Sequence, residues 1–417
     1  MPCLTPPDRT SLSPRRYPQI GRNQLSAGER HTGAIELQHT ATLPAPGRAT
    51  VPFPESARSQ RSEGGYMRAA RFHGRRDIRI DDIPEPELRP GAVKLRVAWC
   101  GICGTDLHEY LEGPIFISPP GHPHPLSHEN APVTMGHEFS GTVEEVGEGV
   151  TDVAVGDNVV VEPYFVCNEC ASCKAGNYHL CTKMGFIGLA GGGGGLSEKV
   201  VVDRRWVHKI GDIPLDEAAL IEPLSVAHHA VVRSGAKAGD VALVGGAGPI
   251  GLLVAAVLKG LGVTTIVTEL SDARKQKALS SGVAHHVIDP SSEDVKARVL
   301  ELTDGVGADL GFECAGVDVV LDTILDAVRP AAVVVNVSIW GKPATVDMQK
   351  LVLKEIDLRG TIAYVRDHEA VIEMVRSGVI DLAPFITGRI ELDNLVSEGL
   401  TTLIEHNDTA VKILVRA

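Results

Sequence analysis

The segment from Val241 to Gly251 constrains the fold of this chain more than any other stretch. It is an apolar run followed by the pattern G-x-G-x-x-G at Gly246, Gly248 and Gly251. In that order, such glycines serve a tight turn, a close approach of the backbone to a pyrophosphate, and close packing of a helix on a sheet. The expected helix begins at Ile250, directly after Pro249, and its N-terminus offers free N–H groups to phosphates. The segment therefore predicts a strand, turn and helix that bind a dinucleotide.

Glu269 stands about twenty residues further on, at the end of the next expected strand. A carboxylate at this place hydrogen-bonds the ribose hydroxyls of NAD and repels the 2′-phosphate of NADP. Arg274 follows five residues later and could pair with a phosphate, which argues for NADP instead of NAD. A glycine-rich turn in an ordinary α/β domain is the alternative, but it does not explain why strand, helix and acid occur together. We expect NAD as the cofactor, bound by Gly246, Gly248, Pro249, Ile250, Gly251, Glu269 and Arg274.

Strands and helices alternate around this segment. Strands are expected at 241–244, 265–268, 286–288, 309–313 and 332–337, and helices at 250–261, 272–280, 292–302 and 319–328. Such alternation indicates right-handed crossovers and a parallel sheet covered on both faces. We therefore expect an α/β fold here, with residues 225–360 forming a doubly wound Rossmann domain.

Residues 67–224 show a different rhythm, which predicts an all-β, barrel-like unit. Short strands are separated by turns rich in glycine, proline, aspartate and asparagine, with strands expected at 78–80, 92–98, 141–146, 158–162 and 198–202. Residues 361–417 return to mixed short elements, and we expect them to pack back onto this first domain.

Residues 1–66 differ from everything that follows. They contain nine prolines, eight arginines and no lysine, and they show no helical or strand period. Such a segment buries too little apolar surface to offset its ordering entropy, so a disordered extension is expected. A start assigned too far upstream, with Met67 as the working initiator, is the alternative. No secretory signal pattern is visible, and a cytoplasmic location is expected.

Charge and hydropathy exclude two classes of partner. Of the 417 residues, 40 are Lys or Arg and 53 are Asp or Glu, which gives a formal net charge of −13. A protein that relies on phosphate contacts with nucleic acid has the opposite balance. One stretch, 241–258, is apolar enough to suggest a membrane span, but its glycines and proline indicate a buried strand and helix instead.

Four of the eight cysteines are crowded into fifteen positions and predict a metal site in a reducing compartment. Four thiolates without an open position suit a closed, tetrahedral structural zinc. An iron–sulfur cluster is the alternative, but the fourth cysteine is too distant and lacks the following proline. The ligands of this structural zinc would be Cys167, Cys170, Cys173 and Cys181.

A second group of possible metal ligands comes from distant segments. Cys103, His137, Glu138 and Glu222 would supply one thiolate, one imidazole and one or two carboxylates. An incomplete protein shell of this kind is what a catalytic zinc needs, because a position stays open for water or substrate. Each residue also has an ordinary explanation, as a small core residue, a loop histidine or a solvated charge, and spacing alone does not connect them.

Together these motifs resemble the zinc-dependent medium-chain alcohol and polyol dehydrogenases. The resemblance covers residues 67 to about 417 and rests on the segments 100–110 (Cys-Gly-Ile-Cys-Gly-Thr-Asp-Leu-His-Glu-Tyr), 136–139, 167–181, 222–224 and 246–251. Segments 113–117 and 121–126 place it nearer to the enzymes of small diols than to those of sorbitol. The resemblance implies a GroES-like β-barrel catalytic domain beside the Rossmann domain, two zinc ions per chain, and a homodimer or homotetramer.

The resemblance also implies roles for individual residues. Cys103 and His137 would be ligands of the catalytic zinc, and Glu138 or Glu222 would supply the carboxylate. Thr105 and His108 match the hydroxyl and imidazole of the family's proton relay.

The implied reaction is hydride transfer between NAD and a small secondary vicinal diol or its hydroxyketone, with 2,3-butanediol and acetoin as the best candidates. A sorbitol- or L-iditol-type polyol dehydrogenase is the alternative enzyme. A non-catalytic protein that binds zinc and a dinucleotide is a further alternative, and it would hold one zinc ion rather than two.

Overall fold

The computed structural model describes residues 65–417. Most of the extension expected over residues 1–66 lies outside the described residues. Strand β1 (Tyr66–Gly74) begins within that range, so its expected boundary was wrong by one residue. Tyr66 belongs to the strand because β1 pairs along its length with β2 (Asp77–Pro84), where Tyr66 lies opposite Pro84.

A six-stranded parallel sheet confirms the predicted α/β half of the fold. The strand order is β13-β12-β11-β14-β15-β16. The strands are β11 (Val241–Gly245), β12 (Thr264–Thr268), β13 (His286–Ile288), β14 (Ala308–Glu313), β15 (Val328–Asn336) and β16 (Asp357–Gly360). Five of them match expected strands. The sequence did not reveal β16 because most of its residues are exposed and it carries no apolar pattern.

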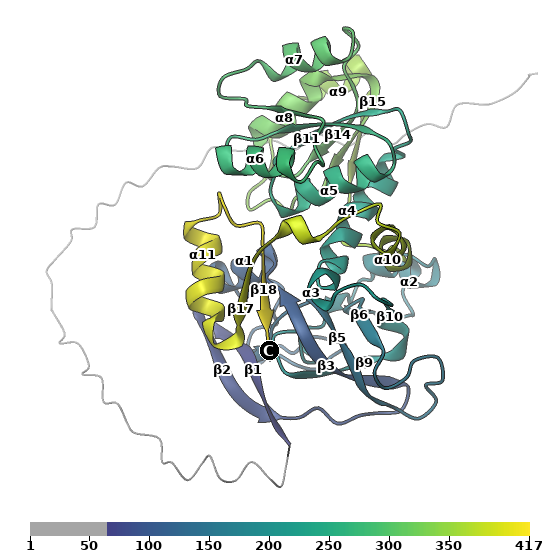
Figure 1. Cartoon of the computed structure of the whole chain (residues 1–417), viewed down its shortest axis with the longest axis vertical. Coiled ribbons are helices and arrows are strands. Elements are labelled where there is room, and N and C mark those ends of the chain that lie inside the picture. Colours follow the sequence, from purple (N-terminus) through teal and green to yellow (C-terminus); the bar gives the residue numbers. More distant parts are fainter. Residues whose placement is uncertain (1–64) are drawn as a thin grey trace, which may run out of the picture. The chain divides into compact units, whose positions relative to one another are not determined.

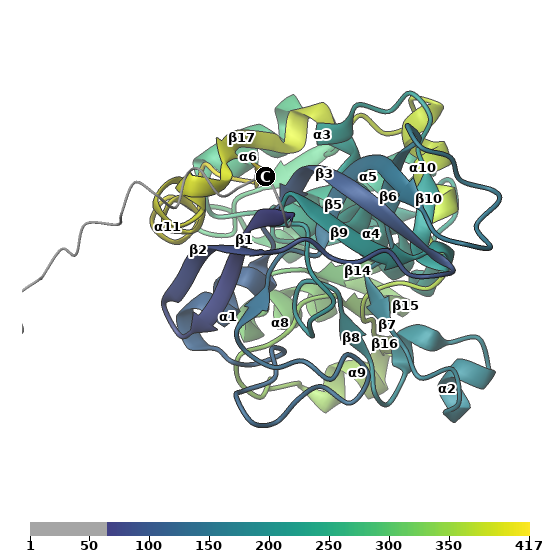
Figure 2. The same ribbon diagram turned by 90° about the horizontal axis from the view of Figure 1, so that it is seen from below.

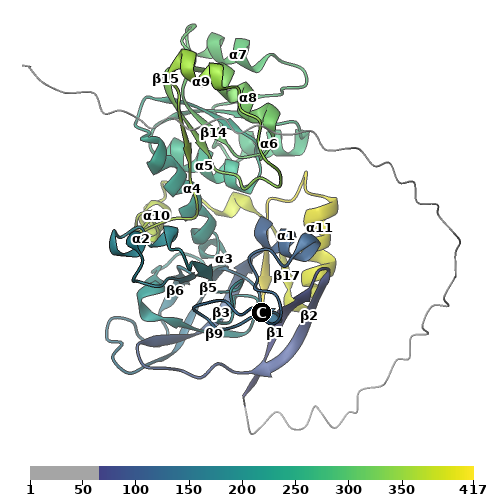
Figure 3. The ribbon, with the colours of Figure 1, turned by 180° about the vertical axis from the view of Figure 1, so that it is seen from behind.

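Helices cover both faces of this sheet (Figures 1 and 3). They are α5 (Pro249–Gly260), α6 (Asp272–Ser280), α7 (Val295–Leu302), α8 (Asp318–Ala327) and α9 (Met348–Lys354). Along β11, Val244 packs in one core with α5, whereas Leu243 packs in another with α7 and α8. Successive side chains of a strand point to opposite faces, so one short apolar strand contributes to both cores.

The start of α7 differs from the prediction. The helix begins at Val295 instead of residue 292, because Asp294 caps it. The Asp294 carboxylate accepts a hydrogen bond from the N–H of Ala297 at 3.0 Å. Such a cap ends the preceding turn and satisfies one of the free N–H groups of the first helical turn.

The other half of the fold is a β unit, as predicted, whose strands pair antiparallel except for the last pair of the larger sheet, which is parallel. The larger sheet has the order β10-β6-β5-β3-β18-β17, with β9 also paired to β3 (Figure 2). Its members are β3 (Ala92–Gly101), β5 (Glu138–Val146), β6 (Asn158–Val161), β9 (Lys199–Asp203), β10 (Val207–Lys209), β17 (Ile386–Glu391) and β18 (Lys412–Arg416). Smaller sheets join β2, β1 and β4 (Val133–Thr134), and β7 (Tyr164–Phe165) with β8 (Gly185–Phe186).

Two elements, β18 and α4, bring residues from distant parts of the sequence to the site. Strand β18 pairs antiparallel with β3, where Val415 lies opposite Cys100, so the C-terminus returns to the first half of the chain. Helix α4 (Ile221–Ser234), which the sequence did not predict, carries Glu222 in its first turn. The limits of the two domains, at 224/225 and 360/361, stay a prediction. No helix within residues 65–417 is both long enough and apolar enough to cross a membrane.

Candidate active site

Cys103, His137 and Glu138 come together in one group, in which His137 and Glu138 are buried and Cys103 is partly buried. Cys103 caps the N-terminus of α1 (Gly104–Glu112), just after β3 ends, while His137 and Glu138 lie at the start of β5. One ligand atom from each of the three lies within 4.8 Å of the others. A soft sulfur, an imidazole nitrogen and a carboxylate oxygen fit a zinc site that keeps one position open. The residues present therefore suit a catalytic zinc.

Of the two candidate carboxylates, Glu138 belongs to this group of three and Glu222 does not. Glu222 is 6% exposed, and its Oε1 accepts a hydrogen bond from the hydroxyl of Tyr364 at 2.6 Å. Burial raises the pKa of Glu222 to about 7, and the charge of His137 opposes that rise. The carboxyl group of Glu222 is thus buried and held by Tyr364 outside the group of three.

Asp106 supports His137 from the first turn of α1. Its Oδ1 lies 3.7 Å from Nδ1 of His137, within ion-pair distance, and neither of these buried atoms has a hydrogen-bond partner. Its Oδ2 accepts a hydrogen bond from the N–H of Cys103 at 2.9 Å. Burial raises the pKa of the Asp106 carboxyl group. A carboxylate behind a metal-binding histidine fixes the tautomer and orientation of the ring, so Asp106 prepares both Cys103 and His137 as ligands.

Lys412 neutralises Glu138. Its Nζ lies 2.8 and 2.7 Å from the two carboxylate oxygens, and it also donates to the carbonyl of Ile102 at 3.2 Å. The exposed fractions of the two side chains are 4% and 1%. Burial lowers the pKa of Lys412, but the charge of Glu138, its hydrogen bond to the lysine, and nearby Cys103 and Glu222 together raise the pKa above its usual value, so the lysine stays charged. Glu138 is thus held in a defined orientation beside Cys103 and His137.

The two residues expected in a proton relay lie on α1. Oγ1 of Thr105 is 3.7 Å from Sγ of Cys103, next to the metal group. His108 lies one turn further along the same helix and is exposed. Thr105 thus lies next to the metal group and His108 at an exposed position three residues later, while their role in a proton relay stays a prediction.

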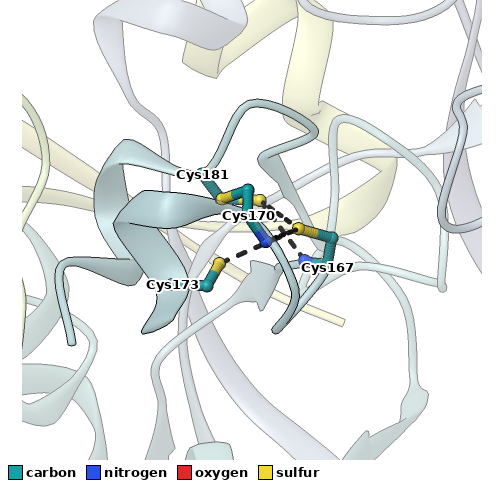
Figure 4. Close-up of side chains that lie close together, drawn as sticks. All are labelled: Cys167, Cys170, Cys173 and Cys181. Atoms are coloured by element: carbon teal, nitrogen blue, oxygen red, sulfur yellow. Dashed lines mark hydrogen bonds between the residues drawn. The ribbon is translucent and has the colours of Figure 1, made fainter. Parts of the chain in front are cut away.

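The four cysteines of the second site form one compact cluster (Figure 4). Sγ of Cys181 lies 3.5 Å from Sγ of Cys167, which in turn is 3.9 Å from Sγ of Cys173. Four sulfurs bound to one zinc at about 2.3 Å would be about 3.8 Å apart at tetrahedral angles. Hydrogen bonds from backbone N–H groups, the largest from Cys173, lower the pKa of Cys170 to about 6. The cluster therefore fits a closed zinc site.

Replacing Cys170 by serine is expected to lower the thermal midpoint, with activity lost only as the folded fraction falls. The zinc ties together a loop of short elements, α2 (Ala171–Lys174) and a single turn at Tyr178–Leu180, with little core of its own. Differential scanning calorimetry and turnover should be measured together. Full thermal stability combined with a selective loss of turnover would contradict a structural role.

The glycine turn has the geometry that a dinucleotide needs. Gly246 has φ = +99°, in the left-handed region that favours glycine. A Cβ atom on Gly251 would lie 2.0 Å from the carbonyl oxygen of Gly246, whereas a Cβ on Gly248 would meet no atom within 4 Å. Gly248 caps α5 and Pro249 begins it. Gly246 thus allows the tight turn, and Gly251 allows the helix to pack closely against it. Open space remains at Gly248, beside the helix N-terminus.

Glu269 and Arg274 both lie at this turn. Oε2 of Glu269 accepts from the N–H of Ala247, while Oε1 accepts from the N–H groups of Leu270 and Ser271. Arg274 lies 4.0 Å from Glu269 and donates to the carbonyl of Asn407. The acidic residue therefore faces the glycine turn, and the arginine is held between it and the C-terminal segment.

Comparisons with known proteins agree with both halves of this description. Residues 89–212 match the family model "Alcohol dehydrogenase GroES-like domain", and residues 249–377 match "Zinc-binding dehydrogenase". The chain is 64% identical over 350 residues to (R,R)-butanediol dehydrogenase of Neisseria gonorrhoeae, covering 84% of this chain and 99% of the relative. The chain belongs to the zinc-binding alcohol dehydrogenase family. The predicted GroES-like and Rossmann combination is thereby confirmed.

Two other members of the family differ in how similar they are to this chain. A crystal structure of 2R,3R-butanediol dehydrogenase from Bacillus subtilis has a TM-score of 0.79 and 48% identity, covering 84% of this chain and 99% of that one. Sorbitol dehydrogenase of Bacillus subtilis is 30% identical over 357 residues, covering 84% of this chain and 97% of the relative. Within the family, the chain is thus more similar to these butanediol dehydrogenases than to this sorbitol dehydrogenase.

Three residues of the site were missed in the sequence. Asp106 has a local signal, because it stands three residues after Cys103 on the first turn of α1. Lys412 and Tyr364 have no such signal, since they reach the site from β18 and from the segment after β16. Only the fold brings these two residues to Glu138 and Glu222.

Proposed function

We propose that this enzyme transfers a hydride between NAD and a small secondary vicinal diol or its hydroxyketone, with (R,R)-2,3-butanediol and acetoin as the substrate pair. The observation that carries the substrate assignment is the 64% identity with (R,R)-butanediol dehydrogenase over almost the whole length of that relative. The thiolate, imidazole and carboxylate group supports the reaction class. The glycine turn faced by Glu269 supports the cofactor.

A zinc ion held by Cys103, His137 and Glu138 would supply a Lewis acid that polarises the reacting C–O bond. Asp106 holds His137 in one orientation, and Lys412 holds Glu138. Glu222, in the first turn of α4, offers a buried carboxyl group to a hydroxyl or water molecule at the open position. The residues of the site thus place the diol carbon for transfer of its hydride to C4 of the nicotinamide.

The proton of the reacting hydroxyl needs a separate path to solvent. Thr105 lies beside Cys103, and His108 lies exposed one turn along α1. We assign Thr105 as the group that accepts the hydroxyl proton and His108 as the group that passes it on. Diol oxidation then gives the hydroxyketone, NADH and one proton released to solvent.

Replacing Glu269 by alanine is expected to reduce the preference for NAD over NADP by about 10- to 100-fold. The carboxylate supplies charge-assisted hydrogen bonds to a ribose, each of about 1.5–3 kcal/mol, and repels a phosphate. The ratio of kcat/KM for the two cofactors measures the effect. The matched control is Asp272→Ala, since the Asp272 side chain is 96% exposed and pairs with Lys275. An unchanged preference in Glu269→Ala would refute the assignment.

We also propose that the chain assembles as a homodimer or homotetramer in the cytoplasm. Strand β16 lies at the end of the parallel sheet, and nearby α9 exposes Val352 and Leu353 at 70% and 81%. Large exposed apolar side chains beside an open sheet edge are typical of an interface between subunits. Light scattering on the purified protein tests the assembly, and a monomer at micromolar concentration would argue against it.

The proposed function is tested by NADH production with (R,R)-2,3-butanediol, meso-butanediol and sorbitol in parallel, before and after a strong chelator. Turnover on (R,R)-butanediol that the chelator abolishes, with two zinc ions per chain, is the expected result. Turnover on sorbitol alone would favour the polyol dehydrogenase. One zinc ion per chain and no turnover on any substrate would favour the non-catalytic protein.

A further inference from the structure

Tyr364 is the hydrogen-bond partner of Glu222. It lies between β16 and α10 (His368–Arg376), is fully buried, and donates its hydroxyl proton to Oε1 of Glu222 at 2.6 Å. Among residues 65–417, no other hydrogen bond to the Glu222 carboxyl group is seen, which leaves Oε2 free. Because the two residues are 142 positions apart, the contact joins helix α4 to the segment that follows the parallel sheet.

The backbone around Tyr364 is held at several independent points. The hydroxyl of Tyr164 donates to the carbonyl of Tyr364 at 2.8 Å. The N–H of Val365 donates to Oδ2 of Asp367 at 2.8 Å, and the N–H of Arg366 donates to the hydroxyl of Tyr178 at 2.9 Å. With several points of attachment, the position of the Tyr364 ring does not depend on a single bond.

A second set of hydrogen bonds joins the segment around Tyr364 to α4. Oδ1 of Asp367 lies 2.6 Å from Nδ1 of His228, and Oδ2 lies 3.1 Å from Nδ1 of His229. Both histidines belong to the helix that carries Glu222. Two sets of hydrogen bonds therefore join α4 to this segment, one at Glu222 and one at the two histidines. The Tyr364 hydroxyl and the Glu222 carboxyl group thus have a defined relative position.

We propose that Tyr364 is a positioning residue for the reaction: its hydroxyl fixes Oε1 of Glu222 and thereby directs Oε2 toward the open position beside Cys103, His137 and Glu138. The inference rests on the role given to Glu222 in the proposed function. A purely structural explanation is that a buried tyrosine needs a hydrogen-bond acceptor. The two explanations differ in what they predict for turnover.

The experiment compares two buried hydroxyl groups in the zinc-loaded full-length enzyme. Tyr364→Phe keeps the ring and removes the hydroxyl on Glu222, and we expect kcat for diol oxidation to fall about 10- to 100-fold with little change in KM. The matched control is Ser234→Ala at the other end of α4, which removes a buried hydroxyl whose hydrogen bonds go to neither Glu222 nor Tyr364; its kcat should stay within about threefold of wild type. Both variants should lose some thermal stability and keep their zinc, because each loses buried hydrogen bonding.

A double-mutant cycle with Glu222→Gln separates the two proposals. If Tyr364 acts through Glu222, adding Tyr364→Phe to Glu222→Gln should change kcat by less than about threefold, whereas Ser234→Ala should be additive. Near wild-type turnover of Glu222→Gln would overturn the role of Glu222 and the positioning inference with it. Loss of turnover in Glu222→Gln with an active Tyr364→Phe would overturn the positioning inference alone, as would equal losses in Tyr364→Phe and Ser234→Ala.

A third variant covers the case in which Tyr364→Phe folds poorly. Glu222→Asp withdraws the carboxylate from Tyr364 and leaves the tyrosine itself unchanged. We expect a lower kcat at similar KM with the zinc retained, and a lower thermal midpoint because the buried Tyr364 hydroxyl loses its acceptor. Wild-type kcat in Glu222→Asp would show that the contact does not matter for turnover.

Discussion

Replacing Lys412 by methionine is expected to lower the free energy of unfolding by about 3–5 kcal/mol. Lys412 and Glu138 form an ion pair in which the exposed fractions of the side chains are 4% and 1%. Methionine fills a similar volume but leaves the Glu138 carboxylate buried without its cation, and that desolvation cost is no longer offset. Equilibrium denaturation of the zinc-free protein, in which no metal ion offsets the charge of Glu138, would quantify the loss.

Two comparisons make this prediction specific. Lys350 also pairs with two carboxylates, Asp322 and Asp326, at 2.7 and 2.8 Å, but near the surface, so Lys350→Met should cost about 1 kcal/mol or less. Combining Lys412→Met with Glu138→Gln removes both charges and should recover part of the stability. A Lys412→Met protein as stable as Lys350→Met would show that the buried ion pair contributes no more to stability than the surface pair.

Replacing Cys103 by alanine is expected to lower turnover by on the order of a thousandfold or more, while the thermal midpoint changes little. Cys103 supplies the thiolate of the three-residue metal group, and loss of a Lewis acid removes several kcal/mol of transition-state stabilisation. Its side chain is only partly buried, so truncation removes little packing. Steady-state kinetics and zinc content of the purified variant are the measurements.

Cys100→Ala is the matched control for this prediction. Cys100 is fully buried three residues earlier, near the end of β3, and does not belong to the metal group. It should keep its catalytic zinc and most of its turnover, and it should lose stability because a buried side chain is truncated. Wild-type turnover of Cys103→Ala, or equal inactivation of both variants, would contradict the assignment of Cys103 as a ligand. The pattern is the reverse of the one expected for Cys170→Ser, where stability is lost first.

Patterns within short stretches of sequence revealed most of the fold. The glycine turn at Gly246 to Gly251, the strand β13 and the helix α6 lie where they were expected. The reason is that a turn, a cap or an apolar period depends on residues a few positions apart. Exposed elements without such a pattern, such as β16, were not visible.

The sequence by itself determined which residue types are available for each metal site, because four close cysteines and a thiolate, imidazole and carboxylate set limit the chemistry. It did not determine which carboxylate joins Cys103 and His137. The tertiary structure places Glu138 in one group with Cys103 and His137, and it brings Lys412 to Glu138 and Tyr364 to Glu222 across 274 and 142 positions. Contacts between such distant residues depend on how β18 pairs with β3 and how α4 packs, which no local pattern of residues reports.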